Sequence, residues 1–594
     1  MKNIFIFLSL TVLFAACNSQ EKANQTEVNS NLTTTLDQSQ KEWVERTLSN
    51  MSISEMAAQV VMDWYGGYYT PVESDEFERE KKEMERGNGG LWLNGGGPYD
   101  QAVKSNELGK YAKVPLLVAS FKGLGSKLFE TAESMKWASG AGTDLPPAMA
   151  YGAIGDPQAI KEAGRIVGIE NQAIGNHVAG GREVSVLLNL ENVLHNRCLG
   201  DDPEQIALLA SAYISGVHEV GRLTKTSVFP GAGSLEGDPH VVLPITWEDR
   251  QTFDSIHFVP FRAAIKAGTD MIMTSHFATP GLTGLDTLPA TLSPEITRIL
   301  REDLGFEGVL ITDAMAMGGI TNTYEKFEAS ILAFKAGNDM ILGPPYFFSD
   351  TLANRVEKGE IPLDQLKSSV RRILELKAKV GLHKENMVNL ENISTIVGRR
   401  SHQMIADSAA SRSIVLLRDK NAHVPLDFGS SSKVLSISYE REDNRYASRE
   451  FNRILGNHVK SVDTERISPS SGPSVYNDLY QQAQNFDKVI FSVYLRPLLG
   501  REVQDKMSDS FIQFVKDLQS EDKEVILVSF GELEVLDDLP ELGTFMLAWS
   551  SQDVMQRAAA KAILGINPIS GHLPINLLPF HKRGEGLERK NTLR

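Results

Sequence analysis

Cysteine is almost absent from this chain, which contains only Cys17 and Cys198 among 594 residues. Two cysteines cannot form a disulfide framework, nor a cysteine-based zinc or iron–sulfur site. The sequence also lacks a Gly-x-x-x-x-Gly-Lys-Ser/Thr phosphate loop, a His-Glu-x-x-His metal motif and a Gly-x-Ser-x-Gly nucleophile elbow. We therefore expect no metal and no cofactor.

Basic residues are also scarce relative to acidic ones. The chain has 60 Lys and Arg and 76 Asp and Glu, which gives a formal net charge of −16. An acidic surface argues against nucleic acid as a partner, since phosphate binding requires a basic face. Hydrophobic residues make up 42% and charged residues 23% of the chain, as in ordinary globular proteins. A single core stops growing near ~250–300 residues, so the length predicts two large domains.

The N-terminus reads as an export signal. Lys2 precedes an apolar run from Ile4 to Ala16, which is too short for a permanent membrane span. The run ends in Phe-Ala-Ala-Cys17, which resembles a bacterial lipobox, whose cysteine becomes the lipidated N-terminus. We expect a lipoprotein signal peptide over 1–17, a flexible polar tether over 18–39, and a lipid-anchored location in the bacterial cell envelope, periplasmic or on the outer-membrane surface. The alternative is a simple signal peptide with a chance cysteine.

A weak internal repeat in the first long region predicts a barrel. Phe261–His276 and Ile331–Pro345 both read as amphipathic helix, Ala-Gly, a polar residue, Asp and an apolar strand. Repeated units over residues 40–382 favour a TIM-type (β/α) barrel, with a doubly wound sheet as the competing fold. Barrel enzymes place working residues at the C-terminal ends of strands, where His276 and Asp313 fall. Asp313 could instead simply cap a following helix.

The second region is predicted to be smaller. Residues 383–400 are polar and irregular, and we take them as a linker. Four apolar runs separated by helical segments then predict an α/β sandwich domain over 401–594. The runs are Lys433–Tyr439, Lys488–Arg496, Glu524–Gly531 and Thr544–Ser550.

Two groups of residues are left outside the predicted site. Asp75–Arg86 is dense in charges of both signs and is interpreted as a solvated helix face. The early aromatic residues are interpreted as core or rim packing, since that is the commoner role near a barrel. They are Trp64, Tyr65, Tyr68, Tyr69 and Trp92.

What remains is a site centred on carboxylates. Asp238 and His240 lie two residues apart in a glycine-rich loop, and an Asp beside a His can orient the imidazole as a general acid/base. A second carboxylate, Asp313, could then act as a nucleophile. Retaining glycosidases need such a pair, one group to protonate the leaving oxygen and one to attack the sugar. Glu236 or Glu502 is the alternative acid/base.

Several motifs in the right order resemble glycoside hydrolase family 3, in the branch of the bacterial β-N-acetylglucosaminidases. The resemblance extends from about Ser52 to Leu577. It rests on Phe229-Pro-Gly-x-Gly followed by Asp238-x-His240, on Pro289–Glu295 and Leu300–Ile320, on Asn196–Pro203, and on Gly565–Pro574 in the second domain.

The resemblance implies a role for each matching residue. Asp313 falls on the nucleophile and His240 on the acid/base, with Asp238 as its partner. Arg197 falls on a sugar-binding arginine, and His276 would line the site. It implies a retaining hydrolase of β-linked sugars of N-acetylhexosamine type, acting without a cofactor on oligosaccharides derived from peptidoglycan or chitin.

Three sugar-binding motifs depart from the family pattern. Its usual Lys-His pair is replaced by Ser227-Val228, its Asp-x-Glu-Gly-Gly segment corresponds to Ser120–Leu124, and a common Asp appears as Asn189, which we keep as a candidate substrate-binding residue. Each lost charged hydrogen bond would cost roughly 1.5–3 kcal/mol. A glycosidase of changed specificity, or a non-catalytic lipoprotein that binds a glycan or a partner protein, therefore remains the alternative function.

Overall fold

The computed structural model describes residues 35–120, 142–426, 433–444, 446–495, 498–501, 506–521 and 523–592, without the side chains of 180–182. The predicted lipid anchor at Cys17 and the alternative acid/base Glu502 lie outside these residues. Within the described ranges, no helix is both long enough and apolar enough to cross a membrane.

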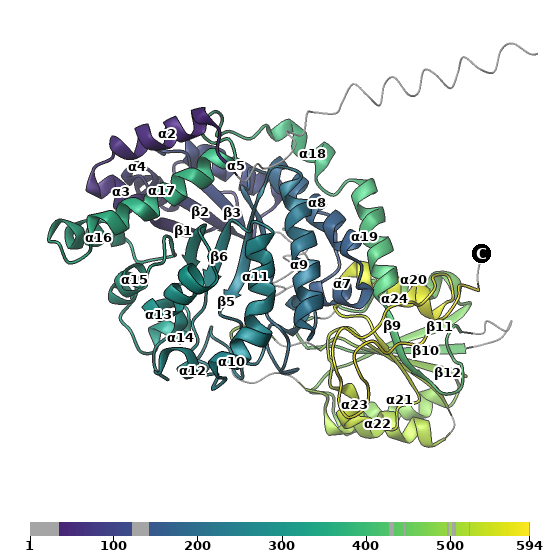
Figure 1. The fold of residues 1–594 in the computed structure, drawn as a ribbon. Helices are drawn as coiled ribbons and strands as arrows, with labels where there is room; N and C mark the ends of the chain where they lie inside the picture. The colour runs from purple at the N-terminus through teal and green to yellow at the C-terminus, as the bar shows by residue number, and fades with distance from the viewer. Residues whose placement is uncertain are drawn as a thin grey trace, which may run out of the picture.

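The first domain is a nearly closed parallel barrel (Figure 1). Its strand order is β7-β6-β5-β4-β3-β2-β1-β8, and a parallel bridge from Ile311 to Met340 brings the two outer strands together. The TIM-type prediction is confirmed, and the doubly wound alternative is wrong because the sheet curls back on itself. The strands are β1 (Val61–Gly66), β2 (Gly90–Asn94), β3 (Leu117–Ser120), β4 (Val178–Glu183), β5 (Leu223–Phe229), β6 (Met271–Thr274), β7 (Val309–Thr312) and β8 (Ile341–Leu342).

Helices surround the barrel strands on the outside (Figure 1). They are α2 (Gln38–Ser49), α3 (Ile53–Gln59), α4 (Asp75–Arg86), α5 (Pro98–Gly109), α7 (Ala148–Ile154), α8 (Pro157–Ala173), α9 (Pro203–His218), α10 (Arg250–Thr252), α11 (Phe258–Lys266), α12 (Pro280–Thr283), α13 (Pro294–Arg298), α14 (Gly318–Thr321), α15 (Lys326–Lys335), α16 (Phe348–Glu357), α17 (Leu363–Lys379) and α18 (Ile393–Ile396).

The internal repeat has a structural basis in two buried aspartates. Asp270 and Asp339 each stand just before a strand, β6 and β8 respectively, and are 3% and 0% exposed. Asp270 accepts a hydrogen bond from the backbone N–H of Thr224 at 2.8 Å, and Asp339 accepts one from Leu310 at 2.9 Å. Each carboxylate therefore joins the start of its own strand to the preceding strand of the barrel.

Basic side chains from the helices neutralise these carboxylates. Asp339 pairs with Arg301 at 2.6 Å and with Arg372 at 2.9 Å, and Asp270 pairs with Lys379. Arg372 and Lys379 both belong to α17, so this helix is fixed to the barrel by two buried charges. A buried carboxylate is tolerated only with such partners, which explains why Asp follows Ala-Gly in both repeats.

The second domain contains a six-stranded sheet of order β11-β10-β12-β13-β14-β9, in which only β9 runs antiparallel to its neighbour. Helices α20 and α24 cover one face and α21, α22 and α23 the other (Figure 1), so the predicted sandwich is confirmed. The strands are β9 (Val415–Asp419), β10 (Lys433–Tyr439), β11 (Ser461–Ile467), β12 (Lys488–Val493), β13 (Glu524–Ser529) and β14 (Thr544–Leu547). The helices are α19 (Arg400–Ser413), α20 (Arg449–His458), α21 (Pro473–Ala483), α22 (Asp509–Ser520), α23 (Val535–Asp538) and α24 (Asp553–Ile563).

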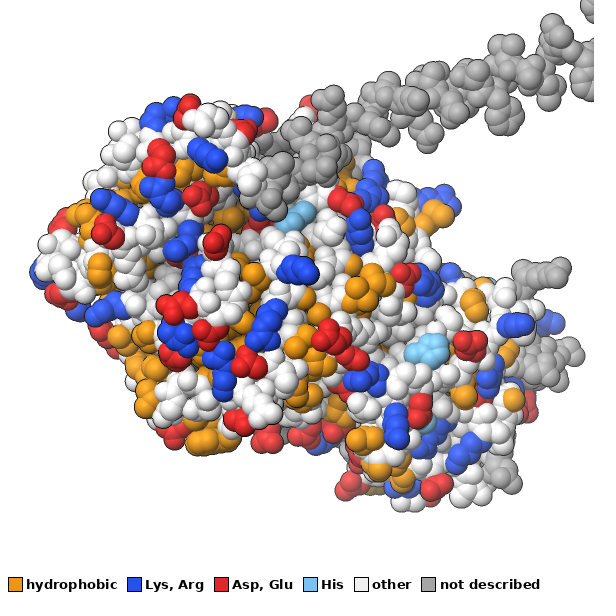
Figure 2. Space-filling view, viewed as in Figure 1, with side chains coloured by type: hydrophobic (Ala, Val, Ile, Leu, Met, Phe, Trp, Pro, Cys, Tyr) orange, Lys and Arg blue, Asp and Glu red, His pale blue; other side chains and the backbone are white. Residues whose placement is uncertain are grey.

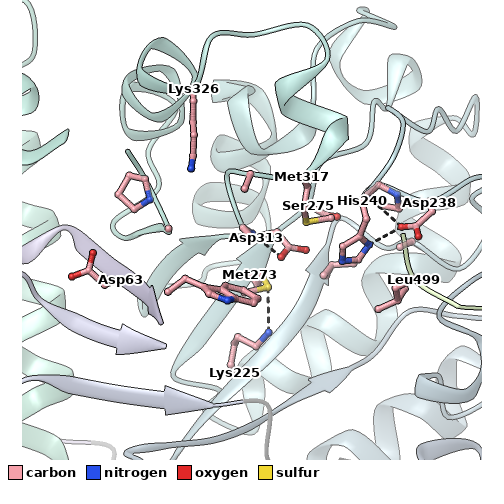
Figure 3. Close-up of a pocket in the computed structure, with 18 of the residues that line it drawn as sticks. Asp63, Lys225, Asp238, His240, Met273, Ser275, Asp313, Met317, Lys326 and Leu499 are labelled. Carbon is pink, nitrogen blue, oxygen red and sulfur yellow. Dashed lines mark hydrogen bonds and ion pairs between the residues drawn. The ribbon is translucent and has the colours of Figure 1, made fainter. Parts of the chain in front are cut away.

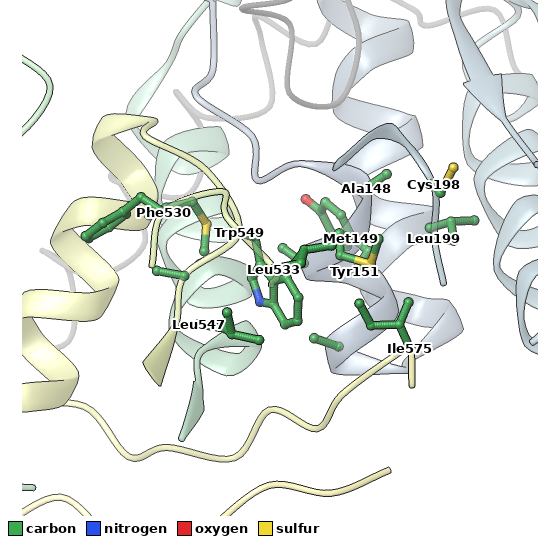
Figure 4. Close-up of a cluster of buried hydrophobic side chains, with 14 of the residues drawn as sticks. Ala148, Met149, Tyr151, Cys198, Leu199, Phe530, Leu533, Leu547, Trp549 and Ile575 are labelled. Carbon is green, nitrogen blue, oxygen red and sulfur yellow. The ribbon is translucent and has the colours of Figure 1, made fainter. Parts of the chain in front are cut away.

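One hydrophobic cluster continues from the barrel into the second domain. In Figure 4, Tyr151 and Leu199 of the barrel face Trp549 and Ile575 of the second domain. Cys198 lies on the barrel side of this cluster and is fully buried. Because the interface is apolar and buried, the two domains share one hydrophobic core.

Hydrogen bonds from the second domain also hold the barrel. Asp144 accepts the backbone N–H of Val554 at 2.8 Å, and Asp201 accepts that of Asn576 at 2.7 Å. Arg583 adds an ion pair to Asp201 at 2.6 Å. These directional contacts fix the orientation of the two domains that the apolar cluster brings together.

The surface carries charges of both signs, intermixed on the face shown in Figure 2. The prediction that Asp75–Arg86 presents only a solvated face is wrong for Glu80 and Glu83, which are 3% and 7% exposed. Glu80 forms a buried ion pair with Lys104 at 2.7 Å. A charge-dense helix thus turns part of its charge inward, because a partner on α5 is available there.

We expect Asp339→Asn to lower the free energy of unfolding by about 3–5 kcal/mol, since it leaves two arginines beside a neutral buried group. Urea denaturation followed by circular dichroism measures this change. The matched control is Asp350→Asn, which removes a 61% exposed partner of Arg86 and should cost about 0–1 kcal/mol. Equal losses in the two variants would contradict the structural role assigned to Asp339.

Candidate active site

A cavity of about 540 Å³ opens at the C-terminal ends of the barrel strands (Figure 3). Asp313, Asp238, His240 and Arg197, four of the predicted site residues, all line it. Parallel barrels bring the ends of different strands to one face, so residues far apart in sequence meet here.

Asp313 directly follows β7 and lies at the centre of the cavity in Figure 3. Its backbone N–H donates to the carbonyl of Thr274 at 2.9 Å, which keeps it in register with β6. Its carboxylate accepts the N–H of Ala314 at 2.8 Å. The backbone N–H of Ala314 thus orients the Asp313 carboxylate, which faces the cavity.

Asp238 and His240 form a close pair. The Nδ1–H of His240 donates to Asp238 at 2.6 Å, and the backbone N–H of His240 donates to the same carboxylate oxygen at 2.9 Å. The other oxygen accepts the N–H of Gly500, from the second domain, at 2.5 Å. With Nδ1 engaged, Nε2 is the ring nitrogen left for the cavity. Figure 3 shows the imidazole between the carboxylates of Asp238 and Asp313.

These hydrogen bonds set the charge of Asp238. Burial alone would raise its pKa, but the hydrogen bonds from His240 and Gly500 hold the pKa below its ordinary value. Asp238 is therefore a carboxylate at neutral pH. It can hold the proton of His240 on Nδ1 and stabilise the imidazolium when Nε2 is also protonated.

His276 does not line this cavity within the described residues. Its ring is fully buried, with Nε2 3.0 Å from the carbonyl of Ala314 and Nδ1 3.0 Å from the hydroxyl of Thr291. Burial lowers the pKa of His276, and the neighbouring Asp313 opposes that shift. The structure therefore places His276 behind Asp313, where its ring contacts the carbonyl of the Ala314–Met315 peptide.

Asn189 is also absent from the residues that line the cavity of Asp313. It lines a neighbouring cavity of about 750 Å³ at the boundary with the second domain, together with the exposed alternative acid/base Glu236. The side-chain amide of Asn189 donates to the carbonyl of Leu235 at 3.1 Å and accepts the N–H of Glu191 at 3.1 Å. Its side chain thus stabilises two loops.

Lys225 is a cavity residue that the motif analysis missed. It lies on β5 with Val228, which also lines the cavity, whereas Ser227 is not among the lining residues. Its position on a barrel strand shortly before the Phe229-Pro-Gly loop is the signal that could have found it. The aromatic prediction is wrong for Trp64 and Tyr65, which line the cavity, whereas Trp92 is buried behind Trp64 with the rings stacked 6.4 Å apart.

Glu248 braces the loop that leads to the Asp238–His240 pair, and no sequence motif indicates this role. It accepts hydrogen bonds from Ser234 at 2.7 Å, from Thr246 at 2.9 Å and from His257 at 2.9 Å. Burial would raise the pKa of Glu248, but these hydrogen bonds lower it from 4.5 to about 2.

In the described part of the chain, no three His, Cys, Asp or Glu side chains come together in a group that could hold a metal ion. Among the side chains that line the cavity are the carboxylate of Asp313 and the imidazole of His240. A carboxylate and an acid/base on one cavity can carry out displacement at a sugar carbon.

Comparison with known proteins identifies relatives over most of the chain. Residues 79–376 match the model of the glycosyl hydrolase family 3 N-terminal domain. A β-N-acetylglucosaminidase/β-glucosidase of Cellulomonas fimi is 24% identical, covering 82% of this chain and 88% of the relative. β-Hexosaminidase A of Pseudoalteromonas piscicida is 25% identical, covering 71% and 77%. The solved structure of a family 3 β-N-acetylglucosaminidase from Paenibacillus sp. superposes with a TM-score of 0.76 at 26% identity, covering 89% and 99%.

We expect Glu248→Gln to lower the free energy of unfolding by about 1–2 kcal/mol at pH 7, because charged hydrogen bonds to the loop are lost. The pKa of Glu248 is lower in the folded state, so its contribution is full above pH 4.5 and is lost as the pH falls towards about 2. The difference in melting temperature between wild type and variant should narrow over that range.

The control for this prediction is Glu302→Gln, which changes a 69% exposed glutamate and should stay within about 0.5 kcal/mol of wild type at every pH. A Glu248→Gln deficit that stays constant down to pH 2 would contradict the assignment.

Proposed function

The chain belongs to glycosyl hydrolase family 3, and from this premise we propose that it is a retaining β-N-acetylhexosaminidase acting on glycans that contain β-linked N-acetylglucosamine. It is a glycoside hydrolase of the β-hexosaminidase-like type, as the names of its relatives indicate. The single observation that carries the proposal is the assembly of Asp313 with the Asp238–His240 pair around one cavity.

In the first step, an oxygen of Asp313 attacks the anomeric carbon of the sugar. The bond to the leaving oxygen breaks, and that oxygen takes the proton from Nε2 of His240. The product is a sugar joined to Asp313 through an ester bond, with the leaving alcohol released. His240 is then neutral, with its remaining proton on Nδ1 and hydrogen-bonded to Asp238.

In the second step, Nε2 of His240 takes a proton from water while the water oxygen attacks the anomeric carbon. The ester bond breaks, Asp313 returns to a carboxylate, and His240 is again doubly protonated beside Asp238. Two displacements at one carbon leave the β configuration unchanged. The Asp238 carboxylate stays hydrogen-bonded to Nδ1 of His240 through both steps.

A non-catalytic glycan-binding protein is the less favoured function. A binding site has no need for a carboxylate aimed at the same cavity as a hydrogen-bonded Asp–His pair, and burying Asp238 costs free energy that only its partners offset. For the natural substrate we propose oligosaccharides derived from peptidoglycan or chitin, whose backbones contain β-linked N-acetylglucosamine.

We expect Asp313→Asn to lower kcat for an aryl β-N-acetylglucosaminide by about 10⁴-fold or more, because the amide is a poor nucleophile. Release of the aryl alcohol measures kcat, and labelling by a mechanism-based fluorosugar, read by mass spectrometry, should occur in wild type alone. Asp364→Asn, at an exposed position on α17, is the matched control with unchanged activity. No release and no labelling with the wild type, on either aryl β-N-acetylglucosaminide or aryl β-glucoside, would refute the proposal.

We further propose that Cys17 is lipidated and anchors the protein to the bacterial cell envelope, on the support of the Phe-Ala-Ala-Cys17 motif and the polar segment after it. The expected result of Cys17→Ala is loss of incorporated labelled fatty acid and loss of the mature protein from the membrane fraction. Cys198→Ser should keep both, because this cysteine is buried in the folded part. A Cys17→Ala protein that still carries the label would exclude this anchor.

A further inference from the structure

Lys225 is a buried cation without a matching acceptor. Its side chain extends from β5 into the cavity, yet the residue is only 3% exposed. The ammonium lies 3.2 Å from the sulfur of Met273 and 5.2 Å from the ring centre of Trp92 (Figure 3). A thioether is a weak acceptor, and a ring accepts no conventional hydrogen bond. Its three N–H groups are therefore poorly satisfied by the protein.

The other buried lysines of the described chain have oxygen acceptors. Lys104 donates to Glu80 at 2.7 Å, Lys377 donates to Gln59 at 2.6 Å, and Lys488 pairs with a glutamate. Burying an ammonium without such an acceptor costs several kcal/mol, so the exception requires an explanation. The cavity beside Lys225 is where an acceptor could enter.

The surroundings of Lys225 suit a sugar. Asp313 lies above it on the same cavity, and Figure 3 shows Lys225 pointing up from the floor towards the nucleophile. Trp64, stacked on Trp92, adds an aromatic wall on which a sugar ring could stack. The adjacent Val228 offers only methyl groups to the cavity. Lys225 is thus the charged donor that β5 presents at this level of the barrel.

We propose that Lys225 is a specificity-determining, substrate-binding residue whose ammonium donates a hydrogen bond to one ring hydroxyl of the sugar that binds against Asp313. This inference rests on the proposed function and extends it to the recognition of the sugar. The hydroxyl oxygen supplies the acceptor that the protein lacks, and hydrogen bonds to a charged group in a desolvated site are strong.

The charge on Lys225 gives the proposal a pH signature. Burial lowers the pKa of Lys225 to about 8, an effect that Asp313 and Glu183 oppose and that Arg197 reinforces. The ammonium is needed for the strong hydrogen bond, and it loses its proton as the pH increases. KM should therefore rise as the pH increases through about 8. Arginine keeps its charge there, so Lys225→Arg should lack this alkaline rise.

The test combines enzyme variants with sugar variants. Lys225→Met keeps the length and the packing on Trp92 but removes the donor, and should lower kcat/KM for an aryl β-N-acetylglucosaminide by about 10- to 100-fold. Analogues that each lack one ring hydroxyl are assayed alongside. For the analogue that lacks the hydroxyl bound by Lys225, the loss of kcat/KM caused by Lys225→Met should shrink to about twofold. The hydrogen-bonding partner of Lys225 is already absent from that analogue.

Lys377→Met is the matched control, since Lys377 is fully buried, has its pKa lowered to about 7 by burial, and lies away from the cavity. It should keep the kcat/KM of wild type in the folded fraction. If Lys225→Met fails to fold, wild type alone decides: one of the analogues should show no alkaline rise in KM, while the others keep it. An equal loss of Lys225→Met on every analogue, or no loss on any, would overturn the proposal.

The failure of the proposed function is distinguishable from failure of this inference. If wild type hydrolyses no aryl glycoside, calorimetric titration with N-acetylglucosamine still tests Lys225. Binding that Lys225→Met weakens by about tenfold would support a sugar-binding role in a non-hydrolytic protein. Equal binding by the two proteins, or no binding by either, would overturn it.

Discussion

The arrangement of the candidate site depends on the carboxylate of Asp238. One of its oxygens accepts two hydrogen bonds from His240, and the other accepts the N–H of Gly500 from the second domain. The orientation of the proposed acid/base is therefore set partly by the interface between the domains. The shared apolar cluster and the hydrogen bonds at Asp144 and Asp201 keep that interface in register. The second domain is thus a structural part of the candidate site, although the proposed reacting groups come from the barrel.

Much of the fold could be predicted from the sequence, because its signals are local. The Ala-Gly-x-Asp repeat predicts a helix, a turn and a buried strand. The structure explains the aspartates of the repeat, because the carboxylates of Asp270 and Asp339 accept backbone hydrogen bonds from the neighbouring strands. Strand β11 escaped prediction, since Ser461–Ile467 lies at a sheet edge and is largely polar and exposed. Strand β9 escaped because Val415–Asp419 follows α19 directly, without a turn signal between them.

The site was predicted in part, and the misses have a common cause. Motifs brought Asp313, Asp238 and His240 correctly to one cavity, because strand ends and loops of a barrel converge on one face. Position along the chain does not tell which way a side chain points once several elements meet. His276 therefore turned out to lie behind Asp313, Asn189 in the neighbouring cavity, and Trp64 and Lys225 inside the site.

The buried aspartates that join the strands stand before β6 and β8, at the end of the barrel opposite the cavity. The residues that hold the strands together and the residues proposed to carry out the chemistry therefore lie at opposite ends of the barrel. Selection can then alter positions that line the cavity, such as Val228, without weakening the strands that carry them. In evolution, we expect the substrate specificity of such a protein to change before its fold does.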